Sequence, residues 1–257
     1  MLYNPNKKGT IILSHYRSGG TRLIQTSWLA IGEKNTTNLS EWNHTIAHSS
    51  SEYETGVPNP SEFLFRALEK CEKYSLLLIN YPVDICNFHN NGIFEKLKDD
   101  YEIVVLERKN KVNCFLSLPL WEMFIKSGLF KNPKKWTKEN MMQFHKDRIN
   151  YKIGVKGLSL GYTTQTPHIN GLLKDFTSDI LMLRTISDKY NFPIIYYEDY
   201  ENNEEHFVNL FPNIDKEHVL KVAKITNKKI PYVSNDYTEY YHEDVVKHIK
   251  GWKLNEL

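Results

Sequence analysis

Four short apolar runs rich in β-branched residues constrain the fold of this chain more than any other feature. They are Thr10–Ser14, Ser75–Asn80, Glu102–Glu107 and Pro193–Tyr197. Apolar runs of this length are typical of strands that are buried on both faces. Segments with helical spacing lie between them: Thr21–Ile31, Pro60–Tyr74, Lys111–Lys126 and Ile169–Tyr190. This alternation predicts an α/β fold of three layers, in which helices flank a central, mainly parallel sheet.

The chain of 257 residues is predicted to form a single domain, 1–257, because it contains no repeat, linker or low-complexity tract. Two stretches, Glu33–Pro60 and Ser127–Thr166, lack clear periodicity and are expected to be long loops, which are often functional. A last amphipathic helix is expected near Glu243–Trp252.

Composition excludes several classes of protein. The net charge is +2, and basic and acidic residues are intermixed along the chain. The sequence contains no basic stripe, so a nucleic-acid partner is not expected. The three cysteines form no Cys-x-x-Cys pair, which argues against a disulfide framework and a structural zinc site. The N-terminus does not resemble a signal peptide, and no apolar run is long enough to span a bilayer. We therefore expect a cytoplasmic protein without stable membrane insertion.

A glycine-bearing loop follows the first apolar run and precedes the first helical segment. Its residues are Arg17, Ser18, Gly19, Gly20 and Thr21. Glycines let backbone N–H groups approach an anion closely, and a helix N-terminus adds further donors and partial positive charge. The loop lacks the Gly-Lys-Ser/Thr ending of a nucleoside-triphosphate P-loop. The pattern predicts an anion site, although a simple turn before a capped helix explains it equally well when it is taken alone.

A second anion element is expected after the run Glu102–Glu107. Arg108 stands at the exit of that strand, and Ser117 follows on the next helical segment. Ligands of open parallel sheets bind at the carboxyl ends of the strands, where Arg17 and Arg108 are both expected. Taken alone, Arg108 is equally explained as a solvated strand end and Ser117 as a helix-surface residue. The two elements support one another.

The strand and the sequence Arg17-Ser18-Gly19-Gly20-Thr21 resemble the 5′-phosphosulfate loop of sulfotransferases of bacterial or viral type that use 3′-phosphoadenosine-5′-phosphosulfate (PAPS). The resemblance implies a P-loop-like sulfotransferase fold. It places Arg17 on the bridging oxygen or the sulfonate and Ser18 to Thr21 on the 5′-phosphate, with the adjoining Arg22 also among the cofactor-binding residues. Since guanidinium stays charged, Arg17 would stabilise charge and would not donate a proton.

Arg108 and Ser117 resemble the element of that family that clamps the 3′-phosphate. Their separation of nine is that of several bacterial members, whereas animal cytosolic enzymes use eight, so Lys109 stays open as a rival to Arg108. The late run PIIYYEDYENN resembles the family's strand with a Tyr-Glu-Asp ending. Its Glu198 and Asp199 are interpreted as structural, pairing with backbone or a neighbouring Arg. Lys228 and Lys229 are further candidates for the 3′-phosphate.

Sulfuryl transfer needs in-line attack, charge stabilisation and a base for the acceptor proton. Glu41 is the preferred base, because Glu41-Trp42 resembles a Glu-aromatic pair of some bacterial sulfotransferases. His44 and His48 are the competitors, since histidine is the better base near neutral pH. A metal site at the two histidines is not expected without a third ligand nearby. The predicted catalytic set is therefore Glu41, Arg17 and His44, without a metal.

The sequence thus predicts transfer of a sulfuryl group from PAPS to a hydroxyl or amine, with adenosine 3′,5′-bisphosphate as the other product. A small-molecule, carbohydrate or lipid-like acceptor is expected by analogy with the family. The oligomeric state is left open. Two alternatives are a nucleotide or nucleoside kinase-like P-loop enzyme, and a non-catalytic module that retains the fold.

Overall fold

The computed structural model describes residues 1–42, 60–126, 151–154, 157–160, 169–201, 203–227, 236–240 and 243–257. The chain divides into two compact units. Unit 1 comprises Met1–Lys109 and Met182–Lys228, and unit 2 comprises Asn110–Leu181 and Lys229–Leu257. The prediction of a single domain over 1–257 stays a prediction.

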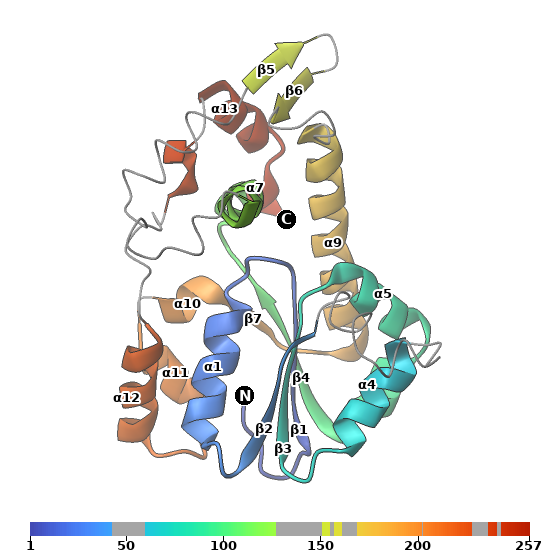
Figure 1. Cartoon of the computed structure of the whole chain (residues 1–257), viewed down its shortest axis with the longest axis vertical. Helices are drawn as coiled ribbons and strands as arrows, with labels where there is room; N and C mark the ends of the chain where they lie inside the picture. Colours follow the sequence, from blue (N-terminus) through green and yellow to red (C-terminus); the bar gives the residue numbers. More distant parts are fainter. Residues whose placement is uncertain are drawn as a thin grey trace. The chain divides into compact units, whose positions relative to one another are not determined.

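A parallel sheet of five strands forms the centre of unit 1 (Figure 1). The strands are β1 (Gly9–Ser14), β2 (Thr36–Trp42), β3 (Tyr74–Ile79), β4 (Tyr101–Glu107) and β7 (Ile194–Tyr196). Their order across the sheet is β2-β3-β1-β4-β7, with every pair parallel. Helices cover both faces, so the predicted α/β fold with a parallel sheet flanked by helices is confirmed.

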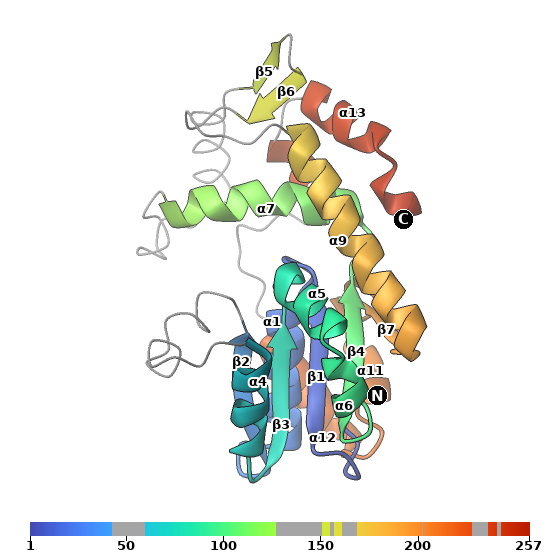
Figure 2. The same cartoon turned by 90° about the vertical axis from the view of Figure 1, so that its right-hand side faces the viewer.

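One face of the sheet is covered by α1 (Gly20–Ile31), α11 (Glu205–Leu210) and α12 (Lys216–Thr226), which share one core with it (Figure 1). The other face packs against α4 (Pro60–Glu69), α5 (Pro82–Asn90), α6 (Ile93–Leu97) and the end of α9 (Ile169–Tyr190) (Figure 2). A short helix, α10 (Tyr197–Glu201), follows β7 directly. The sheet therefore lies between two helical layers, each linked to it by apolar packing.

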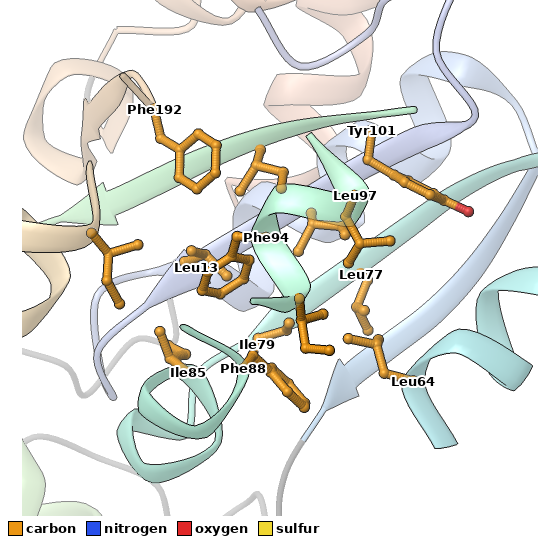
Figure 3. Packing of buried hydrophobic residues seen from close by; sticks show 14 of the residues in the cluster. Leu13, Leu64, Leu77, Ile79, Ile85, Phe88, Phe94, Leu97, Tyr101 and Phe192 are labelled. Carbon is orange, nitrogen blue, oxygen red and sulfur yellow. The ribbon is translucent and has the colours of Figure 1, made fainter. Parts of the chain in front are cut away.

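Alternation of side chains along each strand supplies both cores, because successive residues of a strand point to opposite faces. Ile11 and Leu13 of β1 lie in the core shown in Figure 3, together with Leu77 and Ile79 of β3. Ile12 lies in the core of the opposite face. All six residues of β1 are buried. Burying each large aliphatic side chain contributes about 1.5–3 kcal/mol, so the central strand is firmly fixed.

Unit 2 contains mainly helices and one hairpin. Its described elements are α7 (Lys111–Lys126), β5 (Tyr151–Gly154), β6 (Gly157–Leu160), the first part of α9, η3 (Tyr237–Tyr240), α13 (Glu243–Gly251) and η4 (Leu254–Glu256). Strands β5 and β6 pair antiparallel. The core includes Phe115 and Phe176, whose rings meet edge to face with centroids 5.4 Å apart. None of the described helices combines the length and apolarity needed to cross a bilayer.

The two stretches expected to be long loops contain strands that the sequence did not predict. Strand β2 lies within Glu33–Pro60, and the β5-β6 hairpin lies within Ser127–Thr166. Among the described strands, β2, with the sequence TTNLSEW, pairs with β3 alone and forms an edge of the sheet. An edge strand can carry polar residues because one side of it lacks a strand partner. For this reason an apolar run does not mark β2 in the sequence.

Candidate anion-binding site at the sheet edge

The order of the strands places a topological switch point at the carboxyl ends of β1 and β4. The connection from β1 runs through α1 to β2 on one side of the sheet, while β4 is followed by β7 on the other side. Ligands of open α/β sheets bind where neighbouring strands diverge in this way. Of the predicted anion residues, Arg17 is the third residue after β1, and Arg108 directly follows β4. The topology therefore brings both predicted anion elements of unit 1 to one location.

The loop between β1 and α1 has an unusual backbone. Arg17 has a φ of 64° and Gly19 a φ of 87°, both in the left-handed region. Such a φ is uncommon for a residue other than glycine and costs about 1–2 kcal/mol. The N–H of Ser18, which is buried, donates to the carbonyl of His15 at 3.3 Å. Backbone of this kind turns successive N–H groups toward a common point and forms a concavity suited to anions.

The N-terminus of α1 adds donors to this loop. Its N-cap is Gly19, which has no side chain to accept a hydrogen bond, and its first turn contains no acidic residue. The first N–H groups of any helix lack intrahelical acceptors. In α12, by contrast, the Asp215 side chain accepts from the N–H of His218. The start of α1 thus has the character of an anion site, with partial positive charge and no carboxylate of its own.

Tyr197, the first residue of α10, connects the loop with Arg108. A Cβ placed on Gly19 would lie only 2.0 Å from Cδ2 of the Tyr197 ring, so the ring packs directly on the glycine. The guanidinium carbon of Arg108 lies 4.3 Å from the centroid of the same ring. This cation–π contact attracts the guanidinium to the face of the ring. Burial raises the pKa of Tyr197, which therefore stays neutral at physiological pH. Sequence reasoning missed this residue.

Helix α10 is attached to its neighbours at both ends. At its start, Glu198 Oε2 accepts from the backbone N–H of Lys109 at 2.8 Å, and Asp199 pairs with the Lys109 ammonium. The hydrogen bond with Asp199 raises the pKa of Lys109. At its end, Arg22 Nη1 donates to the carbonyl of Glu201 at 2.9 Å. These contacts agree with the structural interpretation of Glu198 and Asp199, with Lys109 supplying the basic partner in place of an Arg.

A buried ion pair fixes the end of β4. Glu107, whose side chain is 3% exposed, accepts two hydrogen bonds from Arg184 of α9. Nε donates to Oε1 at 3.0 Å, and Nη2 donates to Oε2 at 2.9 Å. The hydrogen bonds with Glu107 raise the pKa of Arg184. Such a two-pronged contact is rigid, so the residue that precedes Arg108 cannot rotate freely.

Several other predicted residues have different surroundings. Gly20 is buried, and a Cβ there would lie 2.7 Å from the Leu78 side chain, while Thr21 is exposed on the first turn of α1. Arg22 is engaged with α10, as described above, and we leave it out of the proposed ligand contacts. Ser117 belongs to unit 2, where its buried hydroxyl donates to the carbonyl of Cys114 at 2.7 Å. The role of Ser117 at a 3′-phosphate stays a prediction.

The predicted bases are described only in part. The backbone of Glu41 lies near the carboxyl end of β2, in register with Leu78 of β3, and its side chain lies outside the described residues. The candidates His44, His48, Lys228 and Lys229 also lie outside them. The carboxyl end of β2 lies on the same side of the sheet as the carboxyl ends of β1 and β4, because the five strands of this sheet are parallel.

Comparisons with known proteins add nothing to this geometry. No family model, curated protein or solved structure matches the chain. Within the described ranges, no group of three or more His, Cys, Asp or Glu side chains is placed to hold a metal ion. The inference about function therefore depends on the arrangement of the residues in unit 1.

Proposed function

We propose that the chain is a PAPS-dependent sulfotransferase with a P-loop-like sulfotransferase fold. The observation that carries the proposal is the contact of one ring, Tyr197, with both the Gly19 backbone and the Arg108 guanidinium. The ring thus contacts both a loop suited to one anionic group and a cation suited to a second. PAPS carries two separate anionic groups, the 5′-phosphosulfate and the 3′-phosphate. ATP carries phosphates only at its 5′ position and has no 3′-phosphate for Arg108 to bind.

Each residue of the site receives a role in the transfer. The N–H groups of the loop and of the first turn of α1 bind the 5′-phosphate, and Arg17 stabilises charge on the sulfonate. Arg108 binds the 3′-phosphate. The acceptor oxygen or nitrogen attacks sulfur as the bond from sulfur to the bridging oxygen breaks, and adenosine 3′,5′-bisphosphate leaves. The acceptor proton passes to the proposed base, Glu41, for which His44 and His48 remain the alternatives.

The choice of nucleotide gives the first test. We expect adenosine 3′,5′-bisphosphate and PAPS to raise the melting temperature of the protein, because a ligand that binds only the folded state stabilises it. ATP with Mg²⁺ is expected to give a much smaller shift at equal concentration. Thermal-shift assays measure all three. A larger shift with ATP and Mg²⁺ would favour the kinase-like alternative, and no shift with any of them would favour a non-catalytic module.

The role of Arg108 gives the second test. Arg108→Ala is expected to weaken binding of adenosine 3′,5′-bisphosphate roughly tenfold and to leave binding of adenosine 5′-phosphate almost unchanged, because a hydrogen bond to a charged group contributes about 1.5–3 kcal/mol. Isothermal titration calorimetry with both nucleotides measures this. Arg66→Ala is the matched control, since Arg66 pairs with Glu62 on the surface of α4. Equal losses for both nucleotides would remove Arg108 from the 3′-phosphate.

A further inference from the structure

Lys109 has the features of a residue that positions the site and does not itself bind the ligand. We infer that Lys109, together with Glu198 and Asp199, holds α10 against the exit of β4, so that the Tyr197 ring keeps its contacts with both Gly19 and Arg108. The sequence offered Lys109 as a rival to Arg108 for the 3′-phosphate. Arg108 and Lys109 have different contacts, which favour ligand binding by Arg108 and positioning of α10 by Lys109.

A series of contacts joins residues 108–109, which follow β4, to residues 196–199, at the junction of β7 and α10. Arg108 lies over the ring of Tyr197, and the next residue on each side is joined by the hydrogen bond from the Lys109 N–H to Glu198 Oε2 at 2.8 Å. The Lys109 ammonium then binds Asp199 and lies 5.1 Å from the ring centroid of Tyr196. Consecutive residues of the two segments, 108–109 and 196–199, are therefore linked to one another. A displacement of one pair is expected to displace the neighbouring pair.

Because α10 is short, it depends on tertiary contacts, which include the buried Tyr200 ring as well as these polar contacts. The helix has five residues, and so short a helix is not stable without tertiary contacts, because its formation fixes more backbone than its hydrogen bonds repay. Arg22 donates to the carbonyl of Glu201 at its end. At its first turn, the backbone N–H of Lys109 donates to Glu198 and the Lys109 ammonium binds Asp199. Tyr197 is the first residue of the helix, directly before Glu198. The attachment at Lys109 is thus the one nearest to the ring.

Electrostatics separate a positioning role from direct binding. Asp199 is an acidic residue close to a proposed anion site, so its removal by itself should raise the affinity for an anion. If Lys109 bound the ligand directly, loss of Asp199 would also release its ammonium for that purpose. A fall in affinity on removal of Asp199 therefore has to come from displaced geometry.

The experiment compares Lys109→Ala, Asp199→Ala and the double variant in the full chain. All three remove the contact between the Lys109 ammonium and Asp199, and all keep the backbone N–H of residue 109 that donates to Glu198. Hydrogen exchange measured by mass spectrometry reports on α10 without any ligand, and calorimetry reports on adenosine 3′,5′-bisphosphate. Asp100→Ala is the matched control, because Asp100 and Lys8 form an exposed ion pair with an N–O distance of 2.7 Å. The two residues directly precede β4 and β1, at the amino ends of these strands. We expect faster exchange over residues 197–201 in all three variants and unchanged exchange there in the control.

The ligand measurement rests on the proposed function. Each single variant is expected to bind adenosine 3′,5′-bisphosphate about fivefold more weakly, and the double variant no more weakly than either, because residues of one network are not additive. Tighter binding by Asp199→Ala, or unchanged exchange in α10, would overturn the inference. If the unaltered protein binds no adenosine nucleotide, the proposed function fails, and the exchange data still decide whether Lys109 positions α10.

Discussion

Gly19→Ala is expected to weaken binding of adenosine 3′,5′-bisphosphate more than about 100-fold, the largest effect we anticipate on the ligand. The new Cβ would lie 2.0 Å from Cδ2 and 2.4 Å from Cε2 of Tyr197, so the ring has to move. Arg108, whose guanidinium lies over that ring, has to move with it. In addition, alanine would have to adopt the left-handed φ that Gly19 has, at a cost of about 1–2 kcal/mol. Both anion elements are thus disturbed together, and calorimetry measures the loss.

Gly92→Ala separates the collision from the backbone strain. Gly92 is also the N-cap of a helix, α6, with a φ of 67° and a ψ of 27°, close to the values of 87° and 13° at Gly19. A Cβ added to Gly92 would lie 3.6 Å from Glu95 Oε2, which is an ordinary van der Waals distance. We expect Gly92→Ala to lose about 1 kcal/mol of stability and no affinity. Normal binding by Gly19→Ala would show that the anion does not bind at this loop.

Arg184→Leu is expected to lower the free energy of unfolding by about 3 kcal/mol, because removal of one partner leaves the buried Glu107 without its two charged hydrogen bonds. Unfolding in urea measures the change. Lys189→Leu is the control on the same helix, since Lys189 and Glu95 form an exposed pair at 3.4 Å. Exposed pairs of this kind contribute about 0–1 kcal/mol, so the control should be nearly as stable as the unaltered protein.

A second substitution checks the cause of this loss. Glu107→Leu combined with Arg184→Leu removes both charges and replaces them with apolar groups, which is often neutral for stability. The double variant should therefore recover most of the stability that Arg184→Leu loses. Equal stability of the single and double variants would mean that the buried carboxylate is not the source of the loss.

The central strands and long helices were predictable because burial leaves a direct mark in the sequence. The apolar runs at Thr10–Ser14 and Glu102–Glu107 correspond to β1 and β4, and Lys111–Lys126 and Ile169–Tyr190 correspond to α7 and α9. In each case, a strand buried on both faces or a long periodic helix provided the signal. Strand β2 was missed because an edge strand lacks that signal.

The candidate site was predictable only where it depends on local sequence. The loop at Gly19 and the cation Arg108 could be found because glycines and strand exits are visible in the sequence. Tyr197 could not be identified in this way, because its role comes from contacts with residues far away along the chain. The pair of Glu107 with Arg184 spans 77 positions and is equally hidden. The signal that remained was the aromatic residue that ends the last apolar run, Pro193–Tyr197.

The discontinuity of unit 1 has a consequence for the order in which the protein can assemble during synthesis. Strand β7 and helix α10 belong to the second segment of this unit, and Ile194 follows Glu107 by about 90 residues. At ordinary elongation rates the ribosome needs on the order of 10 s to make that stretch. Until then, the outer edge of β4 has no strand beside it and is open to pairing with other chains. The nascent protein therefore passes through a period in which this edge can self-associate, and the contacts of Tyr197 with Gly19 and Arg108 can form only when the period ends.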